Sequence, residues 1–289
     1  MGYFFITLGV IFFALTNISD KFVSKGTNKN ESLLLRYIFA IISILLIFLI
    51  TGIDLNIPEL KYSIILIFTG VLAYLINKVM YIGLKEVNTG KFFMVGYSYL
   101  IFLFILNIFV YGKSEILSTT KTIIAMIFIF YILYLTYKSS TGKDKNIFKG
   151  IILALICSIG WTIMFFSEGY FIKIHLVSPL VVMFLVFGGS LITGLVFLFL
   201  GKEKTRILSL SKKDFIIPSL GGIFVSLGSA GLLFSYKYIQ LNIANVLSLS
   251  ELFVTTIMAM IILKEKHSKK EIEEIIIGII ILMVFVGIK

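Results

Sequence analysis

The sequence predicts an all-α, polytopic membrane protein of ten transmembrane helices in two inverted five-helix repeats. Of its 289 residues, 59% are hydrophobic and only 14% are charged, and the mean hydropathy is +1.06. A soluble chain of this size exposes too much surface to hide so much apolar material. Runs of about 18 or more apolar residues recur along the chain, each long enough to cross a hydrocarbon core of about 30 Å. In addition, the second half weakly repeats the first.

The apolar runs and the polar stretches between them predict the ten helices in order. They cover residues 2–20, 32–51, 61–83, 91–111, 117–137, 148–171, 177–200, 214–236, 242–263 and 272–288. We interpret the first run as a span and not as a secretion signal, because it lacks a basic start and a small-residue cleavage site. The loops are short, and the most polar are 138–150 and 201–214.

The internal repeat appears where the first and sixth spans end, in SDKFVSK (19–25) and SEGYFIK (167–173). At an offset of 148 the matching pairs are Gly2/Gly150, Ser19/Ser167, Asp20/Glu168, Phe22/Tyr170 and Lys25/Lys173, and at 152 Lys85 matches Lys237. These matches predict a first repeat over residues 1–140 and a second over 147–289. Because five is an odd number, the repeats would be inverted in the membrane, as in many secondary transporters. Coincidence within low-complexity apolar sequence is the alternative.

Two segments resemble the EamA-like branch of the drug/metabolite transporter superfamily. They are LLLRYIFA (33–40), like the Arg-led second span, and residues 250–288, like the ninth and tenth spans with a Leu-x-Glu turn. The matching positions are Glu251, Glu265, Gly278 and Gly287. The chain departs from the family at Leu252, where proline is common, at Tyr99, where the acid of the first half would fall, and at YGKSE (111–115), in place of the usual Gly-Glu turn. The resemblance implies a permease, often an exporter of small metabolites.

Glu251 is the leading candidate site residue. It lies about nine residues into its predicted span, or roughly 14 Å from the start, so it is expected near the middle of the bilayer. An ionised carboxylate there costs about 2.5–3.5 kcal/mol, which favours a position facing protein or water. We interpret it as a group that couples transport to protons or binds the ammonium group of a solute. Permanent pairing with a lysine of a neighbouring helix is the alternative.

A polar stripe on the third span is a second candidate. Helical spacing puts Tyr74, Lys78 and Tyr81 on one face, beside Asn77. This pattern fits a cavity wall on which Lys78 is the counter-charge of a carboxylate. It fits equally a lysine that extends to the interface within a tyrosine belt.

Three further charged residues lie at helix ends. Arg36 is either an interfacial anchor or, as the resemblance implies, the partner of an acid such as Asp20. Asp20 and Glu168 occupy equivalent positions of the two repeats, where a solvated helix terminus is the simpler explanation of each.

Aromatic and hydroxyl side chains complete the candidate site, because they stack on or hydrogen-bond to a solute. These residues are Tyr97, Tyr99, Trp161 and Ser248. With 14 tyrosines and 28 phenylalanines in the chain, packing alone explains most aromatic positions. Small residues four apart, such as Gly222, Ser226 and Ala230, predict a ridge for close helix packing.

Other function classes find little support. The only histidines, His175 and His267, fall in loops, and Cys157 is the only cysteine, so no metal site or disulfide is expected. Motifs of hydrolases and phosphate-binding loops are absent, so we expect neither an enzyme nor a cofactor. The net charge of +11 comes largely from lysines in short loops, which suits anionic lipid headgroups rather than nucleic acid.

Most of these basic residues follow odd-numbered spans, as Lys143, Lys145, Lys202, Lys204 and Arg206 do. The positive-inside rule then places both termini outside, whereas the resemblance implies termini inside, and the orientation stays open.

The sequence therefore predicts a secondary transporter in the plasma or inner membrane. It would move a small polar metabolite or amino-acid-like solute, outward by analogy with the family, through a central cavity that opens alternately to each side. Protonation of Glu251 is the hypothesis for coupling. A channel, a membrane scaffold and a membrane-embedded enzyme are the alternatives, and a homodimer is left open.

Overall fold

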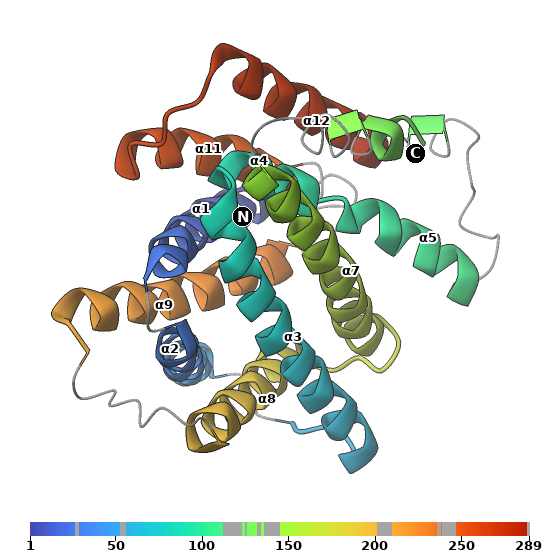
Figure 1. Ribbon diagram of the computed structural model, residues 1–289. Helices are drawn as coiled ribbons and strands as arrows, with labels where there is room; N and C mark the ends of the chain where they lie inside the picture. The colour runs from blue at the N-terminus through green and yellow to red at the C-terminus, as the bar shows by residue number, and fades with distance from the viewer. Residues whose placement is uncertain are drawn as a thin grey trace.

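The computed structural model describes residues 1–26, 29–52, 56–111, 123–124, 126–131, 134–135, 145–200, 210–235, 238 and 247–287. Within these ranges the regular structure is helical throughout. The helices are α1 (Gly2–Lys25), α2 (Lys29–Thr51), α3 (Leu60–Glu86), α4 (Thr89–Gly96), α5 (Tyr99–Tyr111), α7 (Lys145–Lys173), α8 (Pro179–Leu200), α9 (Lys212–Ser235), α11 (Ser250–Ile262) and α12 (Lys269–Gly287) (Figure 1).

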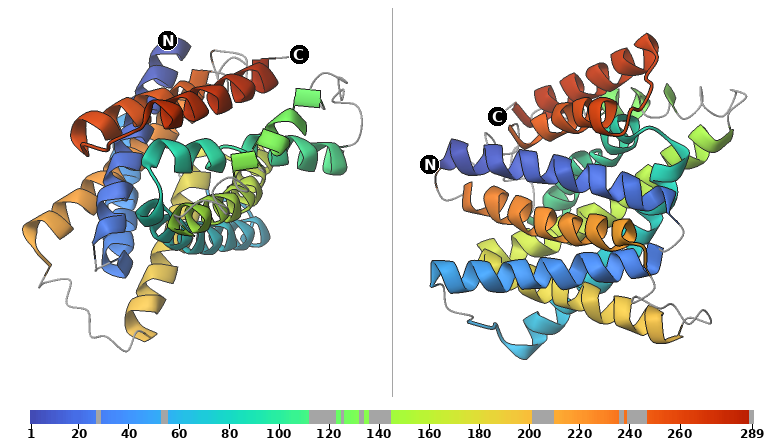
Figure 2. Two further views of the ribbon diagram at one scale, coloured as in Figure 1. Left: turned by 45° about the horizontal axis from the view of Figure 1, so that its top comes forward. Right: turned by 90° about the vertical axis from the view of Figure 1, so that its left-hand side faces the viewer.

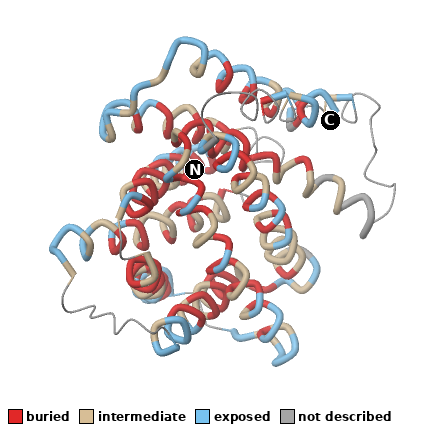
Figure 3. Tube along the Cα trace, viewed as in Figure 1, coloured by how far each residue is buried: buried red, intermediate tan, exposed pale blue. Residues whose placement is uncertain are grey.

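Six of the described helices are long and apolar enough to cross a membrane: α1, α2, α3, α8, α9 and residues 146–172 of α7. Large apolar side chains on their outer faces are exposed, such as Leu49 at 79% and Phe199 at 81%. Burial is concentrated on the faces that the helices turn toward one another (Figure 3). Apolar side chains facing outward are stable in lipid, so the chain is a multi-pass membrane protein.

The helices pack in a defined order. Helices α1, α9, α2 and α8 lie side by side, each against the next (Figure 2, right). Helix α3 packs on both α7 and α8, and α11 lies against α1 and α4. Segments far apart in the sequence are therefore neighbours, with α9 inserted between α1 and α2.

Glycine makes two of these contacts close enough for backbones to touch. A Cβ atom at Gly222 of α9 would overlap the carbonyl oxygen of Arg36 in α2. A Cβ atom at Gly70 of α3 would likewise overlap the carbonyl oxygen of Val186 in α8. The Ser190 hydroxyl donates to the Gly70 carbonyl at 2.8 Å, which adds a hydrogen bond between helices. The small-residue ridge predicted at Gly222 thus meets another helix.

Replacing Gly222 by alanine should therefore destabilise the protein by about 1–3 kcal/mol, because the added methyl group meets backbone that cannot rotate away. The free energy of unfolding in detergent measures the effect. Gly188→Ala in α8 is the matched control, since a Cβ atom there meets nothing within 4 Å. Equal effects of the two substitutions would contradict this account of the α9–α2 contact.

The predicted helix 91–111 is interrupted, which corrects the sequence-based expectation of one continuous span. Helix α4 ends at Gly96, and α5 begins at Tyr99. Between them the amide of Ser98 donates to the Val95 carbonyl at 3.1 Å and that of Leu100 to the Tyr97 carbonyl at 3.1 Å. Hydrogen bonds between residues three apart tighten the helix into 3₁₀ turns, which often mark a functional hinge. The Leu252 amide donates to the Leu249 carbonyl at 3.1 Å in the same way, just where α11 begins.

Parts of the predicted topology lie outside the described residues. They include most of the predicted fifth span (117–137), the loops at 138–144 and 201–209, and the first residues of the predicted ninth span (242–246).

Candidate functional site

Glu251 lies in the first turn of α11 and faces the protein interior, with only 6% of its surface exposed. The amide nitrogen Nδ2 of Asn17 in α1 donates to Oε1 of Glu251 at 2.7 Å, and to Oγ1 of Thr255 at 3.1 Å. The Tyr97 hydroxyl donates to the other carboxylate oxygen. A buried carboxylate with donors on both oxygens is held in one orientation, and the donors offset part of its desolvation.

Tyr97, which reaches Glu251, lies at the break between α4 and α5. Tyr97 is the cap residue that directly follows α4, and its φ and ψ of −67° and −4° are those of a helical turn. Its ring is buried, and the hydroxyl crosses to the start of α11. The two helix starts, at Tyr99 and Ser250, are thus linked through the Tyr97–Glu251 hydrogen bond.

An aromatic group adjoins this polar contact. The ring of Tyr99 lies 5.5 Å from that of Tyr97 and 4.8 Å from that of Phe165. Trp161 stands edge-on to Tyr99 and parallel to Phe93, with ring centroids 6.3 and 6.2 Å apart. The predicted residues Tyr97, Tyr99 and Trp161 therefore gather in one place next to Glu251. A carboxylate beside aromatic faces is suited to a solute that carries an amine on an apolar body.

A second buried acid lies between α1, α2 and α3. The Arg36 guanidinium forms an ion pair with Asp20, and the Tyr81 hydroxyl donates to Oδ1 of Asp20 at 3.1 Å. Asp20, Arg36 and Tyr81 are at most 5% exposed, while Nε of Arg36 has no hydrogen-bond partner among the described residues. Arg36 therefore pairs with Asp20, as the resemblance implied, and neither residue is a solvated helix end. A functional role for them stays a prediction.

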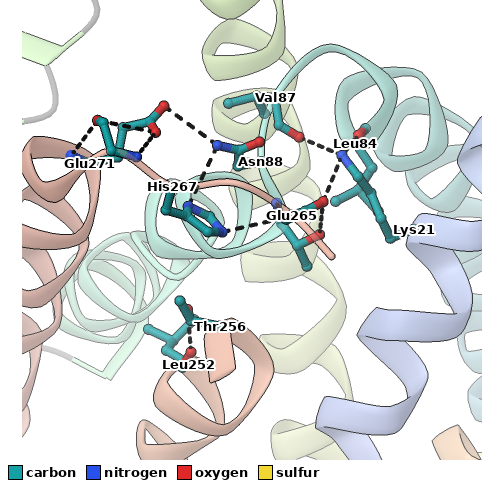
Figure 4. A network of polar contacts seen from close by, with 11 residues as sticks. Lys21, Leu84, Val87, Asn88, Leu252, Thr256, Glu265, His267 and Glu271 are labelled. Carbon is teal, nitrogen blue, oxygen red and sulfur yellow. Dashed lines mark hydrogen bonds and ion pairs between the residues drawn. The ribbon is translucent and has the colours of Figure 1, made fainter. Parts of the chain in front are cut away.

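A third polar group lies where α1 and α3 end, and Figure 4 shows its network of contacts; we call this end of the molecule the Glu265 end. Nζ of Lys21 donates to the Leu84 and Val87 carbonyls where α3 ends, and lies 3.3 Å from Oε1 of Glu265. Glu265 also accepts hydrogen bonds from the Thr89 amide at 3.0 Å and the Thr89 hydroxyl at 2.9 Å, at the start of α4. A carboxylate at a helix N-terminus is favoured by the unpaired amides there. The turn after α11 is thereby fastened to the ends of α1, α3 and α4.

The other residues of the predicted stripe on α3 have separate partners. Nζ of Lys78 lies over the Phe197 ring of α8, 4.2 Å from its centroid, and no described carboxylate lies within ion-pair distance of it. Asn77 donates to the Tyr37 hydroxyl. The Tyr74 hydroxyl is buried and has no hydrogen-bond partner in the part of the chain that the structure describes, and the Tyr74 ring stacks on Phe197. A counter-charge role for Lys78 stays a prediction.

The remaining candidates lie elsewhere. Ser248 comes immediately before the tight turn at Leu249. Glu168 lies near the end of α7, partly exposed, and forms no hydrogen bond or ion pair with any described residue.

The sequence-based site missed residues that hold these acids. Asn17 and Thr255 contact each other and Asn17 also contacts Glu251, while Lys21 and Thr89 hold Glu265. Asn17 and Lys21 are both polar residues of α1, and the cost of burying polar groups in lipid is the signal that could have found them. Thr255 lies one helical turn after Glu251, on the same face. Among the described residues, no group of histidine, cysteine or acidic side chains could hold a metal ion.

Comparisons with known proteins agree with this architecture. Residues 148–287 match the EamA-like transporter family. A solved structure described as "Crystal structure of protein" is similar over 98% of this chain and 95% of that one, with a TM-score of 0.63 and 11% identity, and this likeness concerns the fold alone. No curated protein sequence matches the chain. The family matched by these residues is one of membrane transporters and belongs to the drug/metabolite transporter superfamily.

Proposed function

We propose that this protein is a secondary transporter that binds a small metabolite between two inverted five-helix repeats and exports it by alternating access. Glu251 carries the proposal. It lies in the second predicted repeat and is held by Asn17 and Tyr97 of the first, next to two helix breaks. Secondary transporters with inverted repeats bind their solutes where discontinuous helices of the two repeats meet, near the bilayer midplane.

The repeat itself is supported by matching contacts. Gly222 approaches the Arg36 carbonyl oxygen and the Ala40 amide nitrogen of α2, and Gly70 approaches the same atoms of Val186 and Ser190 in α8. The glycines are 152 residues apart, and their partners are 150 apart. An unrelated pair of packing contacts would have no reason to repeat both offsets.

The helix breaks repeat in the same way. The hydrogen bond from Leu100 to Tyr97 and that from Leu252 to Leu249 have the same span and the same length of 3.1 Å. They lie 152 residues apart, the offset of the glycines. At the position equivalent to Glu251 stands Tyr99, and Phe165 is equivalent to Asn17. We infer that one repeat offers a carboxylate and an amide to the solute, and the other offers aromatic rings.

The solute that suits this pair of surfaces carries an amine or another cationic group on an apolar body, as many amino acids and amines do. The amine would replace Asn17 or Tyr97 as a partner of the Glu251 carboxylate. When no amine is bound, Glu251 would take up a proton instead, and this exchange would couple transport to protons. All the named residues of the proposed site belong to one chain. A homodimer and a location in the plasma or inner membrane stay predictions.

Screening the purified protein for thermal stabilisation by a metabolite library tests the proposal, because a ligand of the folded state raises its apparent stability. We expect amine-bearing compounds with apolar bodies to stabilise it, and the same compounds to cross proteoliposome membranes with saturable kinetics. A scaffold would give no stabilising compound, and a channel would give ionic currents. Either result would contradict the proposed transport.

A further inference from the structure

The two repeats treat their equivalent acids differently. Asp20 of α1 is 2% exposed and bound by Arg36 and Tyr81. Its equivalent, Glu168 of α7, is partly exposed and has no described partner. The glycine contacts make Val186 the equivalent of Arg36, and the offset of 152 makes Leu233 that of Tyr81. At these equivalent positions the second repeat therefore has the acid, but neither the cation that neutralises it nor the hydroxyl that donates a hydrogen bond to it.

The surroundings of these acids also differ. Lys21, next to Asp20, is 4% exposed and bound to the Glu265 end. Its equivalent next to Glu168 is Gly169, where a Cβ atom would meet nothing within 4 Å. Helix α7 begins at the Glu265 end, where Gly150 packs on Val87, so Glu168 lies toward the opposite end, which we call the Glu168 end. The first acid is thus tightly packed, whereas the second is partly exposed and has free space at the neighbouring Gly169.

Alternating access between inverted repeats exchanges the arrangements of the two halves. In the exchanged state α7, α8 and α9 would pack as α1, α2 and α3 do here, and Glu168 would be as buried as Asp20. An ionised Glu168 would then face Val186 and Leu233, with no cation and no donor. Burial of an unpaired carboxylate is strongly unfavourable.

We infer that the Glu168 end closes only when the Glu168 carboxylate has taken up a proton. This inference rests on the proposed alternating access but not on the identity of the solute. A neutral carboxylic acid is far more stable in apolar surroundings than a carboxylate. From the cost of a charge within the membrane, we expect protonation of Glu168 to raise the equilibrium constant for closing about 100-fold. The proton would therefore be bound as this end closes and released as it opens.

Few other ionisable groups in the described part of the chain lie close enough to Glu168 to take up a proton in its place or to pair with its carboxylate. Of the helices that pack on α7, α8 carries no ionisable side chain. Near the Glu168 end, α3 brings Lys61, which is exposed and pairs with Glu59 at 2.9 Å, and Tyr62, whose ring contacts His175. Further along α3, the ionisable residues are Tyr74, Lys78 and Tyr81. Helix α5 contributes Tyr99, and helix α4 contributes Lys91, which pairs with Glu274 at 3.0 Å. Among the described residues none of these forms an ion pair with Glu168.

Trp161 provides the measurement, because it is the only tryptophan of the chain and lies two turns before Glu168 on the same face of α7. In solute-free proteoliposomes or detergent, quenching of its fluorescence by neutral acrylamide should fall as the pH is lowered from about 9 to about 5, the range in which buried glutamates titrate. Lower quenching at low pH corresponds to a closed Glu168 end. Glu168→Gln should remove the pH dependence and hold quenching at its low-pH value.

Two further variants separate charge from structure. Glu168→Asp keeps an acid and should keep a pH-dependent signal. Val186→Arg gives the second repeat the cation of the first and should lower quenching at high pH. Glu273→Gln removes a carboxylate from an exposed position of α12 and should leave the Trp161 response in place, because the response belongs to Glu168.

A wild-type signal that does not change with pH would overturn the inference, and so would a pH dependence that survives in Glu168→Gln. If Val186→Arg does not fold, the Gln and Asp variants of Glu168 still decide. Neither result depends on the metabolite screen, so failure of this inference and failure of the proposed transport are distinguishable.

Discussion

Replacing Glu251 by glutamine should lower solute uptake into proteoliposomes about tenfold to 100-fold, with little change in the stability of the protein. A hydrogen bond to a charged group contributes about 1.5–3 kcal/mol, and this is what the solute amine would lose. Glutamine has the same shape as glutamate, and its carbonyl oxygen can still accept from Nδ2 of Asn17. The loss should therefore appear in the binding and uptake of the solute, measured with an amine that stabilises the wild-type protein.

Glu273→Gln in α12 is the matched control for this substitution. It removes the same charge from an exposed position and should leave uptake unchanged. Uptake by Glu251→Gln at the wild-type rate, with the wild-type pH dependence, would refute both the binding role and the coupling role of Glu251.

Replacing Arg36 by methionine should have the largest effect on stability, a loss of about 3–5 kcal/mol. Methionine fills much of the space but leaves Asp20 with only the Tyr81 hydroxyl, in a site where Asp20 is 2% exposed. Removing one member of a buried ion pair is costly because the remaining charge stays desolvated. Unfolding in detergent by urea or by heat measures the loss.

The double variant Asp20→Asn with Arg36→Met tests the cause. With the charge gone, most of the stability should return, because a neutral amide needs no cation. If the double variant is as unstable as Arg36→Met alone, the packing of the arginine side chain matters more than its charge, and our account of this ion pair is wrong.

The membrane class and most helix positions could be predicted from the sequence because hydrophobicity over a whole span depends little on detail. The predicted spans 32–51 and 177–200 nearly coincide with α2 and α8. The interruption at Tyr97 was missed because GYSYLIF contains no proline and only Gly96 as a helix breaker. A tight turn of this kind is imposed by packing between helices, which a single sequence does not display.

The candidate site could be predicted in type but not in pairing. Buried charge in an apolar run singled out Glu251, since lipid penalises it wherever it stands. Pairing with a lysine of a neighbouring helix was the alternative for Glu251, whereas its described partners are an amide and a phenol, and Lys78 lies over an aromatic ring. Sequence separation explains the difficulty, because Asn17 and Glu251 are 234 residues apart and only the packing of α11 on α1 brings them together.

The backbone contacts of Gly222 with α2 and of Gly70 with α8 have a mechanical consequence. They are alike in both halves, so an exchange of arrangements between the halves would leave them as they are. In the proposed alternating access, a rigid unit would therefore consist of α2, α3, α8 and α9. The helices α1 and α7 and the segments around Tyr97 and Leu249 would move relative to it. The axis of such a movement would pass near the contacts of Gly222 and Gly70, where two helices touch without side chains between their backbones.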